Sequence, residues 1–296
     1  MNTTISALAL GGALSVAACL VPATALAQAR YATPEAAVDA FVAAIERQDT
    51  AAMNRVLGAN WKRLLPPEGI APDDRQAFLD KARERRGVHV EGDTAHLDVG
   101  EDAWQLPIPL ARTSSGQWRF DPVAGLEAVR ERRIGANERF IIQAALAYVD
   151  AQLEYAGQDR NGDGVLEYAR RFMSSTGQRD GLVWSPELGD RSPLGSLYAQ
   201  PKRGDGFHGY HFRILEGQGP AAPGGARSYV IGQRLVSGFA LVAWPARYGE
   251  TGVMSFLVNQ DGLVYERDLG PRSAERAKAM RSFDPAAPWR QVTPAP

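Results

Sequence analysis

Hydrophobic positions in the first half of the chain follow a helical spacing and then an alternating one. Thr33, Pro34 and Glu35 have the order of an N-cap, a proline at the first helical position and an acid in the first turn. The apolar residues that follow predict one buried helical stripe: Ala37, Val38, Phe41, Val42 and Ile45. A second helix is expected over 50–57, before Gly58.

A third helix is expected between Asp73 and Gly87, with Gln76 completing a capping box. Strand-like segments come next, with turns expected at 92–93 and 114–116. The predicted strands are 88–90, 95–99, 104–110 and 117–120. Helices followed by a curved antiparallel sheet predict an α+β domain over residues 30–122.

The second half predicts one long helix and a further antiparallel sheet. Pro122, Gly125 and a charged run around Arg130 indicate a linker over residues 123–136. Asn137 is expected to cap a helix that runs to about Ala156. Predicted strands are 210–215, 239–244, 254–258 and 264–267, with a hairpin turn at 261–262 and a short helix over 273–280. Residues 137–296 therefore form a second α+β domain, a long helix packed on a sheet.

The N-terminus has the pattern of an export signal. Residues 5–21 are almost wholly apolar, Pro22 ends the run, and Ala25-Leu-Ala27 follows. This pattern predicts a signal peptide over residues 1–27, cleavage after Ala27 and a periplasmic protein. An alternative stays open, because Val16-Ala-Ala-Cys19 resembles a lipobox, and only lipidation of Cys19 would bring the protein to a membrane.

Composition narrows the possible chemistry further. Cys19 is the single cysteine, so a chain cleaved after Ala27 has no disulfide and no thiol nucleophile. Lys and Arg total 33 against 34 Asp and Glu, a balance that gives no reason to expect nucleic acid as a partner. No Gly-x-Ser-x-Gly, phosphate-loop or zinc motif occurs in the sequence, and no catalytic or cofactor-binding residue is predicted.

Several blocks in the second half resemble one known family. These are Asn161-Gly-Asp-Gly-Val-Leu-Glu-Tyr-Ala169, Asp180-Gly-Leu-Val-Trp184, Gly209-Tyr-His-Phe-Arg-Ile-Leu215 and Phe239-Ala-Leu-Val-Ala-Trp-Pro-Ala-Arg-Tyr-Gly249. With the Thr-Pro-Glu block they look like the secreted bacterial family catalogued as domain of unknown function 2950. The resemblance implies a Gram-negative envelope protein and implies no activity.

Two looser resemblances concern the separate halves. Residues 33–41 and the closing Trp118-Arg-Phe120 resemble the nuclear-transport-factor-two-like fold, which implies a cone-shaped domain. The second half is similar to the globular heads of type IV pilins and pseudopilins. Pilus assembly through the helix from Asn137 is not expected, because a whole domain and several arginines precede it.

Residues 159–167 have the sequence pattern of the first half of a calcium-binding loop. Asp159, Asn161 and Asp163 carry side-chain oxygens at alternate positions, and Gly164 permits the turn that follows. The expected ligands of a weak Ca²⁺ site are Asp159, Asn161, Asp163, the Val165 carbonyl and Glu167. Arg170 stands where a closing acid is expected, so a turn held by Asx hydrogen bonds is the favoured alternative.

Other candidate sites are weaker. In a strand, His208 and His211 would point to opposite faces and could not share an ion. His89 and His96 would meet only in one particular hairpin register. Gly217-Gln-Gly219-Pro-Ala-Ala222 fits a dinucleotide pattern, but its prolines forbid the helix that the pattern requires, so a surface loop is expected.

The sequence therefore favours a non-catalytic binding or structural-support module with an unidentified envelope component, a glycan or a peptide as partner. Aromatic side chains in the second half are expected in the core, and the alternative is an aromatic groove. That alternative would use Trp184, Tyr198, Phe207, Tyr229, Trp244 and Tyr248. The rival function is a cell-wall or polysaccharide hydrolase with paired carboxylates from Asp159, Asp163, Glu167 or Asp261.

Overall fold

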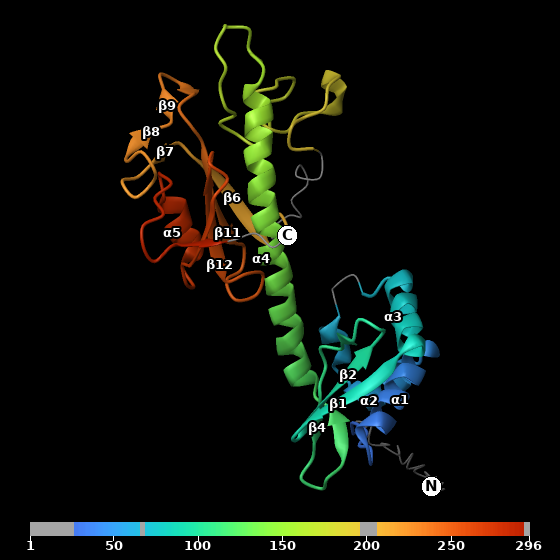
Figure 1. Ribbon diagram of the computed structural model, residues 1–296. Helices are drawn as coiled ribbons and strands as arrows, with labels where there is room; N and C mark the ends of the chain where they lie inside the picture. The colour runs from blue at the N-terminus through green and yellow to red at the C-terminus, as the bar shows by residue number, and fades with distance from the viewer. Residues whose placement is uncertain (1–26, 66–68, 196–205, 293–296) are drawn as a thin grey trace, which may run out of the picture. The chain divides into compact units, whose positions relative to one another are not determined.

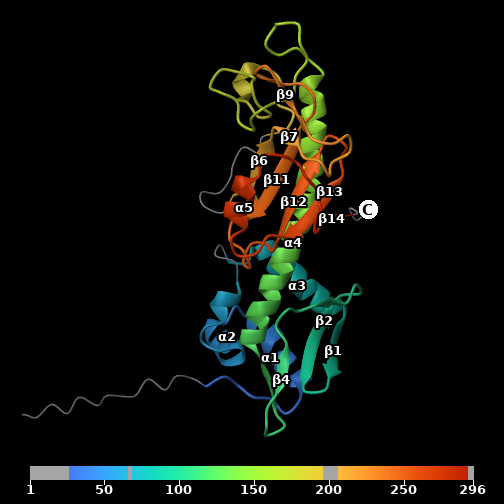
Figure 2. The same ribbon diagram turned by 90° about the vertical axis from the view of Figure 1, so that its left-hand side faces the viewer.

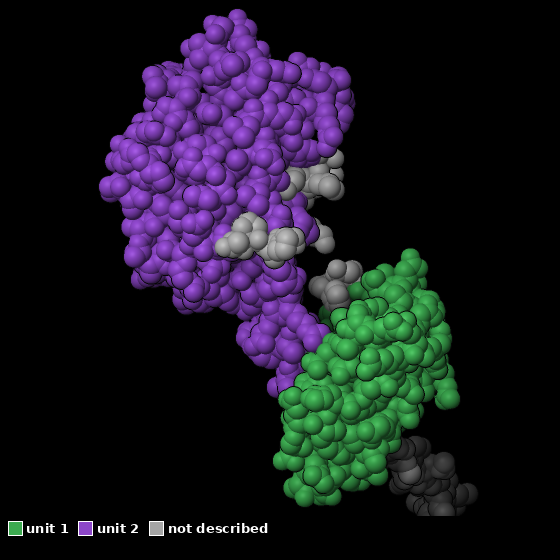
Figure 3. Space-filling view, in the orientation of Figure 1, with its two compact units in different colours: residues 1–122 green, residues 123–296 purple. Residues whose placement is uncertain are grey.

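The structure, a computed structural model, describes residues 27–65, 69–195 and 206–292. The chain divides into two compact units, Met1–Pro122 and Val123–Pro296 (Figure 3). Each unit combines helices with antiparallel strands, so the expected α+β class is confirmed. Residues 1–26, which include Cys19, lie outside the described part, as does Tyr198.

Three helices and one 3₁₀ turn open the first unit, close to the predicted positions (Figure 1). They are α1 (Pro34–Glu46), α2 (Thr50–Leu57), the 3₁₀ turn (Trp61–Leu64) and α3 (Pro72–Glu84). The Thr33 hydroxyl accepts a hydrogen bond from the Ala36 N–H at 3.2 Å, as its position before Pro34 predicted. Asp49 caps α2 in the same way, accepting from Ala52 at 2.9 Å.

The start of α3 differs from the prediction. Pro72 takes the first helical position and Ala71 precedes it, so Asp73 lies inside the helix and caps nothing. Gln76 donates instead to the Asp80 carboxylate, one turn later, at 2.8 Å. A proline with its fixed φ starts a helix without a capping side chain, because it has no N–H that needs a partner.

The sheet of the first unit has the strand order β1-β2-β4-β5, and β3 pairs with β2. Its strands are β1 (Arg86–Glu91), β2 (Thr94–Val99), β3 (Trp104–Gln105), β4 (Leu110–Arg112) and β5 (Trp118–Phe120). The single strand predicted over 104–110 is wrong, because Pro107 and Pro109 interrupt the ladder between β3 and β4. Phe41 of α1 packs on Phe120 with a ring-centroid distance of 5.2 Å, which places the helices against this sheet.

A long helix opens the second unit and replaces the expected linker. Helix α4 (Pro122–Ala156) runs through residues 123–136 without a break, and Asn137 lies inside it rather than at its start. Pro122 does not interrupt the helix, because it stands in the first turn, where proline is tolerated. The segment that follows is rich in helix-forming Ala, Leu, Glu and Arg, which outweigh Gly125 and Gly135 at about 1 kcal/mol each.

The second unit is built on a five-stranded antiparallel sheet in the order β14-β13-β12-β11-β6 (Figure 2). Its strands are β6 (Tyr210–Leu215), β11 (Ala240–Pro245), β12 (Met254–Asn259), β13 (Val264–Asp268) and β14 (Arg290–Val292). The first four agree closely with the predicted strands because their apolar runs are bounded by clear turn residues. Gly262, in the predicted turn between β12 and β13, has φ +70°.

The two faces of this sheet are covered by different helices (Figure 1). On one face Tyr148 of α4 packs edge-on against Phe239 at 5.7 Å and contacts Phe172. On the other lies α5 (Ser273–Ala279), whose last carbonyls accept hydrogen bonds from Arg213 of β6. This helix confirms the one predicted over 273–280, with Arg272 at the N-cap and Ser273 as its first residue.

Short pairs that the sequence did not predict complete the unit. They are β7 (Gly217–Gln218) with β8 (Arg227–Ser228), and β9 (Val230–Ile231) with β10 (Arg234–Leu235). Two-residue strands leave too little alternation to be recognised in a sequence. Within the ranges that the structure describes, no helix has the length and apolar character needed to cross a bilayer.

Candidate functional site

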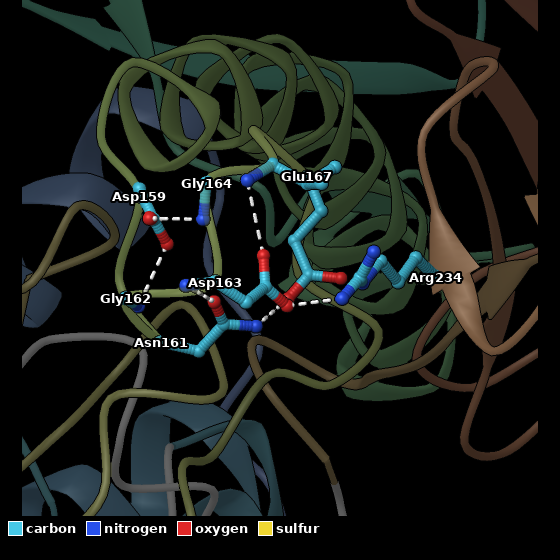
Figure 4. A network of polar contacts seen from close by, with 8 residues as sticks. Asp159, Asn161, Gly162, Asp163, Gly164, Glu167 and Arg234 are labelled. Carbon is cyan, nitrogen blue, oxygen red and sulfur yellow. Dashed lines mark hydrogen bonds and ion pairs between the residues drawn. The ribbon is translucent and has the colours of Figure 1, made fainter.

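The side chains of the acidic loop accept hydrogen bonds from the loop's own backbone (Figure 4). The two carboxylate oxygens of Asp159 accept hydrogen bonds from the N–H groups of Gly162 and Gly164, both at 2.8 Å. Asn161 Oδ1 accepts from the Asp163 N–H at 3.1 Å, and Asp163 Oδ1 from the Val165 N–H at 3.0 Å. These are the Asx hydrogen bonds of the turn alternative, and Gly162 and Gly164 supply positive φ at +75° and +83°.

Two further side chains close the network. Arg234, from the neighbouring β10, pairs with the second carboxylate oxygen of Asp163 (Figure 4). Asn161 Nδ2 donates to Glu167 Oε1 at 3.1 Å. All five residues predicted as ion ligands are therefore brought into one loop, and Arg234 is a member that sequence spacing could not reveal.

Titration in this loop follows from these contacts. Backbone hydrogen bonds, first of all from Gly164, lower the pKa of Asp159 below its ordinary value, so that its carboxylate is ionised at neutral pH. Partial burial, with the neighbouring charge of Asp163, raises the pKa of Glu167. The loop thus gathers three carboxylates and one guanidinium group within a small volume.

The oxygen atoms of this loop are the candidate ligands of a cation. Among the described residues, no three or more His, Cys, Asp or Glu side chains form a set that could hold a metal ion. Arg170, at the position of the missing closing acid, pairs with Glu216 at 2.6 Å and donates to the Gln233 carbonyl at 2.9 Å. The carboxylates of the loop still suit a cation that prefers oxygen ligands, because each carboxylate oxygen has a second lone pair.

The candidate histidines are placed differently from the sequence expectation. His208 lies outside β6 with a positive φ of +46° and stacks on Phe140 of α4 with a centroid distance of 3.7 Å, so it is not the strand residue that was considered. His211 lies opposite Trp244 on β11. His89 and His96 are directly opposite each other in the β1–β2 register, which is the one register that would bring them together.

Most of the aromatic side chains that the sequence analysis considered for an aromatic groove are core residues. Tyr229 is fully buried, and Trp244 and Trp184 are 4% and 6% exposed. Phe207 packs against Phe140 and Phe212. The core interpretation is confirmed for Tyr229, Trp244 and Trp184, but Tyr248 is only half-buried and donates its hydroxyl to Asp268 at 3.1 Å. Trp184 also borders an open cavity.

An open groove of about 590 Å³ lies in the second unit beside α4. Trp184 is one of the lining residues. Its indole N–H donates to the Asp190 carbonyl at 3.0 Å, and Arg160 stacks on its ring at 5.0 Å. Arg191 reaches the groove and makes no hydrogen bond or ion pair with any other described residue. The lining residues are Ala147, Trp184, Pro186, Gly189, Asp190, Arg191, Ser192, Pro193, Leu194 and Gly195.

The remaining candidates supply little chemistry. Asp261, considered for hydrolysis, accepts a hydrogen bond from Asn259 Nδ2 at 2.9 Å inside the β12–β13 turn. The segment with the dinucleotide pattern forms strand β7 and a turn, and Gly217 and Gln218 are buried, which corrects the expected surface loop. A smaller cavity of about 240 Å³ lies in the first unit, beside Tyr31, Arg47 and Arg55.

Comparison with known proteins gives one relationship. The model of a family described as "Protein of unknown function (DUF2950)" matches residues 28–292, nearly all of the chain after the predicted export signal. No curated protein and no solved structure matches the chain. The resemblances to pilin heads and to the nuclear-transport-factor-two-like fold therefore stay predictions.

Proposed function

The chain belongs to the DUF2950 family of unknown function, and from that premise we propose that it is a non-catalytic binding module of the bacterial envelope. Its ligand is a peptide with a free carboxylate, held in the groove beside Trp184. The carrying observation is Arg191, which lines an open groove and whose guanidinium has no acidic partner among the described residues. A peptide carboxylate would supply that partner.

The rest of the groove supports the same ligand. Pro186, Pro193 and Leu194 offer apolar surface, and Asp190 is already paired with Arg179 at 2.5 Å. A cavity of about 590 Å³ is within the range of about 300–1,000 Å³ that small ligands occupy. One cationic group beside apolar walls favours a short peptide over an uncharged glycan, whose hydroxyls would leave the arginine without an ion pair.

We expect Arg191→Ala to weaken binding of cell-wall peptides by about tenfold, a loss of about 1.4 kcal/mol. Arg191→Lys keeps the charge without the planar fork and should bind with intermediate affinity. Fluorescence anisotropy with labelled peptides and, separately, glycan strands from the bacterial wall measures both. Ala147→Trp fills the groove and should abolish binding, while Gln143→Trp, one turn earlier on α4 and outside the lining, should not.

Binding of glycan strands with no peptide binding would identify a glycan module, and equal affinities for all variants would reject the groove.

Purifying the protein from the periplasm also tests export. A first residue of Gln28 supports cleavage after Ala27, and an acylated Cys19 supports the lipoprotein alternative. Turnover of wall material that disappears on Glu167→Gln would instead support the hydrolase, since Glu167 is the loop acid with a raised pKa.

We propose in addition that the acidic loop binds Ca²⁺ weakly through Asp159, Asn161, Asp163, the Val165 carbonyl and Glu167. Support comes from the three carboxylates that lie together in the loop. Partial burial, with the neighbouring charge of Asp163, raises the pKa of Glu167, and a bound cation would offset that negative charge. Arg234 competes with the ion for Asp163. The affinity is therefore expected in the range of about 10⁻⁴–10⁻³ M that extracellular modules show.

Calorimetry of metal-stripped protein with millimolar Ca²⁺ tests this proposal. We expect Asp159→Ala to abolish the binding heat, because it removes the ligand whose two oxygens organise the loop. Arg234→Gln should tighten binding severalfold, because it removes the competing charge. No heat with the wild-type protein, or the same heat with Asp159→Ala, would show that the loop is a turn without an ion.

A further inference from the structure

His89 and His96 are directly opposite each other on the exposed face of the β1–β2 hairpin. Side chains alternate along a strand, so the neighbours Ala95 and Leu97, both fully buried, point to the core, and His96 points away from it. The His89 side chain is 58% exposed. Directly opposite residues of an antiparallel pair have Cβ atoms about 4.5–5.5 Å apart.

We propose that this histidine pair is a bidentate site for a divalent transition metal of the Zn²⁺ or Cu²⁺ type. Zinc–imidazole bonds of about 2.0–2.1 Å place two nitrogens of one ion about 3 Å apart, a distance that side chains on opposite positions can reach. Imidazole is a preferred ligand of these metals and a poor ligand of Ca²⁺. The pair is therefore chemically distinct from the acidic loop of the second unit.

Two carboxylates support the pair from the same face. Glu91 Oε1 lies 2.9 Å from His89 Nε2, which orients the ring and leaves Nδ1 as the coordinating nitrogen. Asp98 follows His96 by two residues, on the same side of β2, and adds negative charge near the ion. The His96 side chain makes no hydrogen bond or ion pair within the described ranges, so its ring is available.

The number of protein ligands sets the expected affinity of the site for the metal ion. Since no group of three His, Cys, Asp or Glu side chains in the described ranges could hold a metal ion, the protein supplies two ligands and water supplies the others. The site should thus be weaker than a four-ligand structural zinc site. The chain has four histidines in all. In the second unit His208 stacks on Phe140, and His211 packs at a tilt against Trp244.

Zn²⁺ titration of the full-length protein by calorimetry tests the pair, and the circular-dichroism melting curve of each variant checks its fold. We expect His89→Gln combined with His96→Gln to weaken Zn²⁺ binding at least tenfold without changing the melting temperature, because both side chains are on the exposed face. His211→Gln, which removes a histidine elsewhere, should leave the affinity unchanged.

A matched variant tests whether Zn²⁺ binding depends on the placement of the two histidines or only on their number. His89→Gln with Val90→His keeps two imidazoles on the same two strands but puts them on opposite faces, and we expect it not to bind. Glu91→His with Thr94→His, added to the pair-deleted protein, places imidazoles at the next opposite position and should restore binding. No Zn²⁺ binding by the wild type at millimolar concentration, binding that survives removal of the pair, or full affinity in the opposite-face variant would overturn the proposal.

Discussion

Replacing Gln152 with leucine is expected to lower the free energy of unfolding of the second unit by about 3 kcal/mol. Gln152 is fully buried on α4. Its amide oxygen accepts from the Ala169 N–H and its nitrogen donates to the Ala169 carbonyl, both at 2.8 Å, and also to the Tyr148 hydroxyl at 3.0 Å. One amide therefore satisfies both backbone groups of a residue outside regular structure.

Leucine would leave those backbone groups buried without partners, at about 1–3 kcal/mol for each, while its own burial offsets part of that loss. Urea unfolding followed by far-ultraviolet circular dichroism measures the difference. Gln143→Leu, at an exposed position of the same helix, is the control and should change stability by no more than about 0.5 kcal/mol. Equal effects of the two variants would show that the Ala169 segment does not depend on this amide.

Gly252→Ala is expected to destabilise the second unit by about 3 kcal/mol or more, because there is no room for a methyl group. A Cβ at this position would lie 2.0 Å from the Tyr210 hydroxyl oxygen and 2.5 Å from its Cζ. Tyr210 is fully buried, and its hydroxyl donates to the Met254 carbonyl at 2.9 Å. A rigid ring held at both ends cannot move aside as a flexible side chain would.

A double-mutant cycle with Tyr210→Ala isolates this contact. The single Tyr210→Ala change should itself cost about 3–5 kcal/mol, but Gly252→Ala should add little in that background, because the clashing ring is gone. Gly249→Ala is the local control. Its Cβ meets no atom within 4 Å and its φ of +75° predicts only about 1 kcal/mol of strain. Additive losses in the cycle would contradict the steric argument.

Local patterns gave the helices and strands where stop signals are unambiguous. Helix α2 ends before Gly58 and strand β6 covers Tyr210–Leu215, both as predicted, because their boundaries depend on neighbouring residues alone. The same reasoning failed where one residue type is compatible with two local structures. Pro122 can end a helix or begin one, and the choice depends on what lies after it.

The sequence by itself determined the α+β class, the family, the oxygen-rich loop and the absence of cysteine after Ala27, since periodicity and composition are local properties. Only the tertiary structure decided which distant groups meet. The Arg234–Asp163 pair joins residues 71 positions apart, and the His89–His96 pair depends on a strand register. The groove beside Trp184 depends on how a loop packs against α4. Register and packing are set by the summed burial of many side chains, which no short stretch of sequence contains.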